Sequence, residues 1–196
     1  MQLTPEEIST ALATCRWRRQ RHSRCVEAAV LLPLFNRGEH THLLVIEKAR
    51  DESRHAGQMA FPGGKRESSD GSALQTALRE AREEINLQQE AVQVLGEAGY
   101  FRTMTSRFDA AVIVGWLLQP ASLQANQEVR NIFHIPLEAL LMDFNPSLNT
   151  CTRSGLLNAH YHVQPRDTAR TICVWGLTAR ILHHFFMALY RIPDGD

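Results

Sequence analysis

The sequence predicts a mixed α/β layered domain, because segments with the pattern of strands are interleaved with two long helical segments. Its 196 residues, of which 44% are hydrophobic, suit one globular domain with a small appendage. No internal repeat, low-complexity tract or linker divides the chain. We therefore expect one domain over residues 25–196, preceded by a helix and a basic arm in residues 1–24.

The N-terminal segment carries the signals of a helix start. Thr4 can cap the helix, Pro5 suits its first position, and Glu7 completes a capping box. Ile8 and Leu12 would then face inward. Five arginines follow between residues 16 and 24. They form either a solvated arm or a site for substrate phosphates, since the guanidinium fork matches phosphate oxygens.

The remaining elements follow from periodicity and turn signals. The segments expected as strands are Val26–Phe35, His42–Lys48, Val92–Gly96, Ala110–Leu118 and Asn131–Ile135, with a late hairpin of His160–Val163 and Thr171–Val174. A turn at residues 36–39 joins the first two strands. Ser72 and Gln75 form a second capping box that opens a helix over Ala73–Ile85, and Leu177–Leu189 is an apolar closing helix.

Composition narrows the classes of function. Lys+Arg and Asp+Glu each number 21, so the basic surplus of a typical nucleic-acid binder is missing. The four cysteines form no CxxC pair, which indicates neither a zinc knuckle nor a disulfide framework. The longest apolar run, Ala28–Phe35, is too short for a membrane span, and the N-terminus lacks the pattern of a signal peptide. We expect a cytoplasmic protein without a membrane segment.

The helix predicted over residues 73–85 carries the chemistry. With residues about 100° apart, Glu80, Glu83 and Glu84 gather on a face away from the apolar stripe. Like charges at this spacing destabilise a bare helix by a few tenths of a kcal/mol per pair, roughly. A hard divalent cation such as Mg²⁺ would turn the repulsion into attraction and would supply an activated water.

The segment before this helix strengthens that interpretation. A string of Arg-Glu-x-x-Glu-Glu alone is more often a solvated helix face. Here it follows Phe-Pro-Gly-Gly and an acidic loop. Gly63 and Gly64 would let the backbone approach a metal or a diphosphate closely, where side chains would collide.

These residues resemble the Nudix box, G-x5-E-x7-R-E-U-x-E-E-x-G-U, where U is apolar. The matching positions are Gly64, Arg79, Glu80, Ala81, Glu83, Glu84 and Leu87. Asp70 stands where the box has glutamate and is one residue further from Arg79 than usual, so its role stays open. Asn86 replaces the late glycine, and asparagine tolerates the left-handed conformation expected after a helix end.

The segment from Lys48 to Gly64 is similar to the signature of coenzyme A pyrophosphatases within that superfamily. Ser53, His55 and Lys48 depart from it, since the signature has Leu, a His one place later, and Arg. Glu128-Val129 before Ile135-Pro136-Leu137, and the run from Trp175 to Ala179, also resemble this subfamily.

The resemblance implies an α/β/α sandwich of the Nudix type, with a mixed β-sheet and Mg²⁺ or Mn²⁺ as cofactor. It implies hydrolysis of coenzyme A to phosphopantetheine and adenosine 3′,5′-bisphosphate. The implied metal ligands are Glu80 and Glu84, with Glu83 beside them and the Gly63 carbonyl as a further ligand. Arg79 would orient a glutamate. The general base is either a box glutamate or Glu128, unless Glu128 is an exposed loop glutamate. From their residue types, Arg54 and His55 either contact substrate phosphates or belong to an exposed loop.

Several alternatives stay open. The substrate could instead be ADP-ribose, a dinucleotide or a nucleoside triphosphate, because the box holds only the diphosphate. A ligand sensor with a lost reaction is disfavoured by the three glutamates, and RNA decapping by the zero net charge. His160 and His162 share one strand face and are either surface histidines or a metal pair. The apolar final helix serves the core or a homodimer interface.

Overall fold

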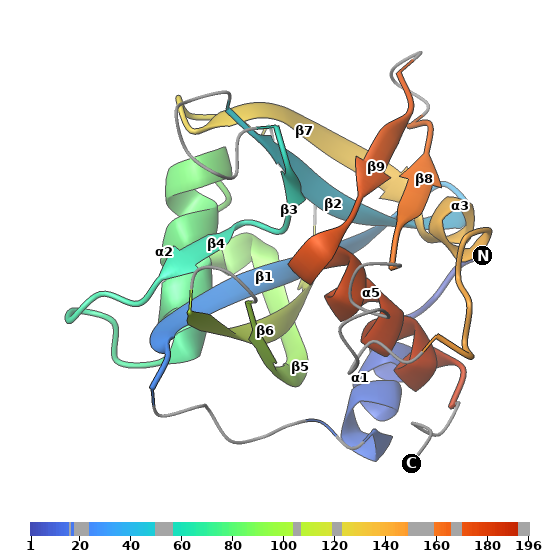
Figure 1. Ribbon diagram of the computed structural model, residues 1–196, viewed down its shortest axis with the longest axis horizontal. Coiled ribbons are helices and arrows are strands. Elements are labelled where there is room, and N and C mark those ends of the chain that lie inside the picture. Colours follow the sequence, from blue (N-terminus) through green and yellow to red (C-terminus); the bar gives the residue numbers. More distant parts are fainter. Residues whose placement is uncertain are drawn as a thin grey trace.

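The computed structural model describes residues 1–15, 17, 24–49, 57–103, 107–118, 123–148, 159–165 and 170–191. Within these ranges a seven-stranded sheet forms the centre of the molecule (Figure 1). Its strands are β1 (Val26–Arg37), β2 (His40–Lys48), β3 (Met59–Ala60), β4 (Gly63–Lys65), β5 (Val92–Arg102), β6 (Phe108–Leu117) and β7 (Val129–Pro136). The other elements are α1 (Pro5–Thr14), α2 (Ala73–Ile85), the 3₁₀ turn η1 (Gln89–Ala91), α3 (Leu137–Leu141), the hairpin of β8 (Tyr161–Val163) and β9 (Ile172–Val174), and α5 (Gly176–Leu189).

The sheet is mixed, because β1 runs parallel to β6 and antiparallel to β2 and β4. β1 and β2 pair only beside their turn, from Leu34–Leu43 to Arg37–His40. Beyond that point β3 pairs with β2, and β4 pairs with β1. The segment from Met59 to Lys65 therefore crosses from β2 to β1 where these two strands are no longer paired.

Alternate residues of the strands build two cores, one on each face of the sheet. On one face Ala29 and Leu31 of β1 belong to the same cluster as Ala77, Ala81 and Ile85 of α2. On the other face the cluster contains Leu32 and Leu34 of β1, Ile8 and Leu12 of α1, and Leu182 and Phe185 of α5. Helices thus cover both faces, and the expected α/β/α sandwich with a mixed sheet is confirmed (Figure 1).

Helices α1 and α2 and the N-terminal cap of α1 agree with what the sequence predicts. Thr4 and Glu7 form the predicted capping box, and Ile8 and Leu12 are buried. α2 spans Ala73–Ile85, and Asn86 has the expected left-handed conformation, at φ 56° and ψ 30°. The second capping box is only half formed. Ser72 Oγ accepts from Gln75 N at 3.2 Å, but Gln75 Oε1 accepts from Gly71 N at 2.5 Å.

The largest corrections concern short or irregular elements. β5 continues to Arg102, well past Gly96, because bulges next to Gly96 and Gly99 break the alternating pattern without ending the pairing. β3, β4 and α3 were not expected, since two to five residues carry too little periodicity. Among the described helices none is long and apolar enough to cross a membrane. Most of the N-terminal arginines lie outside the described residues.

Candidate active site

The candidate site lies where β4 passes α2 and the end of β2 (Figure 1). The side of α2 that carries Glu80 and Glu84 is turned toward Gly63 and Gly64 of β4 and toward Lys48 of β2. The crossing of the Met59–Lys65 segment between β2 and β1 brings the glycines there. Pairing between strands far apart in the sequence thus places the glycines of β4, the basic Lys48 and the glutamates of α2 together.

Glu84 is the most deeply buried of the three box glutamates, with only 2% of its side chain exposed. Its Oε2 accepts a hydrogen bond from Gly63 N at 3.0 Å, and its Oε1 forms an ion pair with Lys48 Nζ. Burial raises the pKa of the Glu84 carboxyl above its ordinary value, while Lys48 acts in the opposite direction. A carboxylate held this way is available to a cation that replaces or joins Lys48.

Glu80 lies one helical turn before Glu84, with 16% of its side chain exposed. Burial raises the pKa of the Glu80 carboxyl, Arg79 opposes this, and the negative charges of Glu84 and Glu83 add to the increase. From the sequence, we expect the absence of side chains at the glycines to let a metal or a diphosphate approach the backbone. In the structure a Cβ on Gly64 would lie 2.5 Å from Glu80 Oε1, so Gly64 makes room for this carboxylate.

Glu83 differs from the other two, because 55% of its side chain is exposed. It pairs with Arg79 Nη1 at 3.1 Å, and Arg79 Nη2 lies 3.0 Å from Glu80 Oε1. Arg79 therefore lies between these two glutamates, where it can fix their carboxylates.

Asp70 is a residue of the site whose role the sequence left open. Its buried carboxylate accepts from Arg79 Nε at 3.1 Å and from Arg79 Nη2 at 3.0 Å, and it also binds Glu67 N and Thr76 Oγ1. The hydrogen bond from Arg79, with those from Glu67 and Thr76, lowers the pKa of Asp70 to about 2 against the cost of burial. Asp70 thus holds Arg79 on the helix, and its spacing from Arg79 gave no hint of this.

We expect Asp70→Asn to lose a pH-dependent part of the stability. Because the pKa of Asp70 is lower in the folded chain than its usual 3.8, the ionised form stabilises the fold at higher pH, and this contribution disappears as the pH falls toward about 2. Urea unfolding of both proteins should therefore show a difference in unfolding free energy that is largest above roughly pH 4 and narrows below it. A difference that stays constant with pH would assign the effect to uncharged hydrogen bonds.

The other predicted site residues, Glu128, Arg54 and His55, do not belong to α2 or β4. Glu128 is exposed and directly precedes β7, and its carbonyl accepts from Ala49 N at 2.8 Å. Its negative charge contributes to raising the pKa of Glu84, so the two carboxyls lie on the same side of the molecule. Arg54 and His55 lie outside the described residues.

A family model described as a NUDIX domain matches residues 26–152. The chain belongs to the Nudix family. A relative from Photorhabdus laumondii named "Uncharacterized Nudix hydrolase NudL" is 39% identical over 158 residues, which are 80% of this chain and 81% of the relative. A protein of the same name from Yersinia pestis is 39% identical over 161 residues, covering 80% of this chain and 76% of its own. The chain is accordingly an enzyme, a Nudix pyrophosphohydrolase.

Two solved structures share the Nudix fold of this chain. A MutT/nudix family protein from Enterococcus faecalis has a TM-score of 0.59 and 13% identity, covering 97% of this chain and 76% of its own. A C. elegans Ap4A hydrolase, solved as a binary complex, has a TM-score of 0.55 and 16% identity, covering 85% and 99%. At such identity the likeness concerns the fold alone.

The glutamate carboxylates of α2 are oxygen ligands of the kind that a hard divalent cation prefers. Glu80 and Glu84 are two oxygen donors with mutual repulsion and raised pKa values, which a hard cation would relieve. Within the described ranges no three His, Cys, Asp or Glu side chains are already gathered around one point. The glutamates are instead directed to Lys48 and Arg79.

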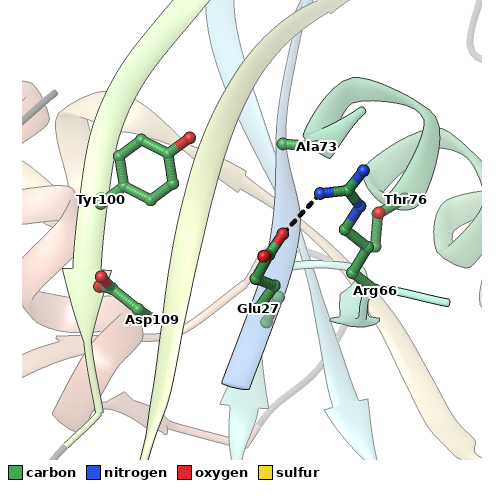
Figure 2. Close-up of a pocket in the computed structure, with 7 residues that line it drawn as sticks. Glu27, Arg66, Ala73, Thr76, Tyr100 and Asp109 are labelled. Atoms are coloured by element: carbon green, nitrogen blue, oxygen red, sulfur yellow. Dashed lines mark hydrogen bonds and ion pairs between the residues drawn. The ribbon is translucent and has the colours of Figure 1, made fainter. Parts of the chain in front are cut away.

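Two further polar features lie away from the Nudix glutamates. His160 and His162 are exposed with stacked rings 6.4 Å apart, and His162 Nδ1 lies 3.3 Å from Asp143 Oδ2. A cavity of about 240 Å³ lies beside the start of α2, lined by Glu27, Ala28, Arg66, Ala73, Thr76, Tyr100 and Asp109 (Figure 2). Across it Arg66 pairs with Glu27 at 2.6 Å and also donates to the Asp70 carbonyl, which links this wall to the Asp70–Arg79 pair.

Proposed function

We propose that this Nudix enzyme hydrolyses the pyrophosphate linkage of coenzyme A or a derivative, giving phosphopantetheine and adenosine 3′,5′-bisphosphate. The resemblance of the Lys48–Gly64 segment to coenzyme A pyrophosphatases supports the substrate. The observation that carries the reaction is the buried Glu84 carboxylate beside Glu80, both next to the glycines of β4. Burying two acids side by side costs stability, and a cation-dependent reaction explains why the chain keeps them.

In the proposed site Glu80 and Glu84 are the main ligands of Mg²⁺ or Mn²⁺, with Glu83 and the Gly63 carbonyl beside them. Such a metal would neutralise phosphate charge and help to activate water as the nucleophile. Arg79, held by Asp70, keeps Glu80 and Glu83 in place. Lys48 acts against the raised pKa of the Glu84 carboxyl through their ion pair, and its ammonium would add positive charge on the side of the site where the diphosphate is proposed to bind.

The reaction needs a group that takes a proton from the attacking water. We assign this role to Glu128, because it is exposed, lies at the start of β7 and acts electrostatically on Glu84. Water adds to one phosphorus atom while the bridging oxygen leaves with the other phosphate. The products are two phosphomonoesters, and the proton passes from water to the carboxylate. Arg54 and His55 are proposed contacts of the substrate phosphates.

Product analysis tests the proposal. The purified enzyme is incubated with Mg²⁺ or Mn²⁺ and coenzyme A, ADP-ribose, NADH, a diadenosine polyphosphate or dGTP, and products are separated by chromatography. We expect adenosine 3′,5′-bisphosphate from coenzyme A at a kcat/KM well above that for the other compounds. Preference for another compound would overturn the coenzyme A assignment and keep the Nudix reaction.

A further inference from the structure

A second charged cluster lies on the other side of the strand end that carries Lys48. Consecutive residues of a strand point to opposite faces, so Lys48 reaches Glu84 of α2 while Glu47 reaches Arg170, which precedes β9. The Cα atoms of two such neighbours are only about 3.8 Å apart. The two clusters therefore share one end of β2.

Glu47 is a fully buried carboxylate whose charge is already matched. With 0% of its side chain exposed, it accepts from Arg170 Nη1 at 3.0 and 3.2 Å and from Asn131 Nδ2 at 2.7 Å. A buried charge is costly unless it is paired and hydrogen-bonded, and Glu47 meets both conditions without any further cation. It also fixes the position of the Arg170 guanidinium.

Arg130 is therefore a surplus positive charge in this cluster. Its Nη1 lies 3.7 Å from Glu47 Oε1, too far for a hydrogen bond, and 46% of its side chain is exposed. Glu47 pairs with Asn131 and Lys48 pairs with Val129, which leaves Arg130 as the extra residue of a β-bulge. Bulges next to active sites change the direction of a side chain, and this one turns Arg130 toward Glu47 and solvent.

We propose that Arg130, supported by the Glu47–Arg170 pair, binds a phosphomonoester on the ribose of the substrate. Among the residues that the structure describes, two arginines face one carboxylate, and the guanidinium fork matches two phosphate oxygens. A phosphomonoester carries a charge of about −1.5 to −2 at neutral pH and is therefore a strong anionic partner for the Arg130 guanidinium. The inference rests on the proposed function for one point: the diphosphate of the same nucleotide would bind at α2, on the other side of the end of β2.

The test compares substrates that differ only in this phosphate. Wild type and Arg130→Ala are assayed with coenzyme A and dephospho-coenzyme A at the same Mg²⁺ concentration. Because a charge-assisted hydrogen bond contributes 1.5–3 kcal/mol, we expect the variant to lose about 10- to 100-fold in kcat/KM with coenzyme A. With dephospho-coenzyme A we expect a change below about twofold, since that substrate has no group for Arg130 to bind. Arg130→Lys should recover part of the loss.

Arg37→Ala is the matched control, because Arg37 is an exposed arginine at the turn end of β1. It removes the same charge at a distance and should not alter the ratio of the two substrates. Thermal unfolding of every variant checks the fold. Arg170→Ala is avoided because it would remove the cation that is hydrogen-bonded to the buried Glu47. An equal loss on both substrates, or no loss on either, would overturn the phosphomonoester site.

Binding separates this inference from the reaction. Calorimetry in the presence of Mg²⁺ measures the affinities of wild type and Arg130→Ala for two pairs of ligands. The first pair is adenosine 3′,5′-bisphosphate and AMP, and the second is NADPH and NADH. Tighter binding of the bisphosphate that disappears in the variant supports the site even if coenzyme A is not hydrolysed, which would sink only the proposed substrate. A preference restricted to NADPH would support the same site and assign it to a 2′-phosphate. Equal binding within each pair would reject it.

Discussion

Replacing Glu84 with glutamine should reduce turnover by about 100-fold or more, because the metal ligand that we propose Glu84 to be would supply several kcal/mol of transition-state stabilisation. The substitution keeps the volume and removes the charge of the most buried box glutamate. A glutamine oxygen can still accept from Gly63 N, so the contact between α2 and β4 is retained. The measurement is kcat at saturating metal together with the metal affinity by calorimetry, and both should fall.

A purely structural role for Glu84 as the partner of Lys48 needs a separate control. The double variant Glu84→Gln, Lys48→Met removes both members of the ion pair, so no cation is left beside an uncharged amide. We expect it to regain thermal stability relative to Glu84→Gln alone and to stay inactive. Recovery of turnover in the double variant would show that Glu84 is not a metal ligand. Glu39→Gln, at the exposed turn between β1 and β2, should behave as wild type.

Glu83 is expected to be the least sensitive of the three glutamates. Periodicity places all three on one helix face, but it does not tell how deeply each is buried. The structure separates them, because β4 and β2 cover Glu84, Gly64 lies against Glu80, and Glu83 projects toward solvent. These differences depend on the pairing of β4 with β1 and on Lys48 of β2, so they were not predictable from the box alone.

The parts of the fold that were predicted share a local cause. α2 was placed correctly because its cap, its apolar stripe and the left-handed Asn86 all lie within fifteen residues. The hairpin of β1 and β2 followed from a turn signal between two apolar runs. The site needed more than this, since the separation of β1 from β2 and the crossing of the Met59–Lys65 segment depend on non-local pairing.

Asp70 and Arg130 are two residues whose partners could not be predicted from residue type and spacing. Asp70 departs from the Nudix box in type and in spacing, yet its carboxylate reaches Arg79 with two hydrogen bonds. Arg130 lies just before the strand expected over Asn131–Ile135, and its position depends on a bulge that no pattern indicates. In both cases the backbone geometry determines the partner, and residue types alone do not predict that geometry.

Gly64→Ala should give a folded enzyme that has lost about 100-fold in turnover, because an ångström of misplacement at a reacting centre costs that much. The added Cβ would lie 2.5 Å from Glu80 Oε1 and 2.6 Å from its Cδ, so the carboxylate must move. The atoms that yield belong to the far end of a flexible side chain, and Gly64 pairs with Ala29 as any strand residue can. We therefore expect little change in thermal unfolding and a clear loss of kcat.

Gly63→Ala is the neighbouring contrast. Here the Cβ would lie 2.4 Å from the Ala29 carbonyl oxygen and 2.6 Å from Val30 Cα, and the φ of 154° disfavours a side chain. Backbone atoms of a central strand cannot move aside, so this variant should unfold at a much lower temperature. One methyl group on each of two adjacent glycines thus separates a loss of chemistry from a loss of fold. If Gly64→Ala kept full activity, Glu80 would not be held at the reacting centre by β4.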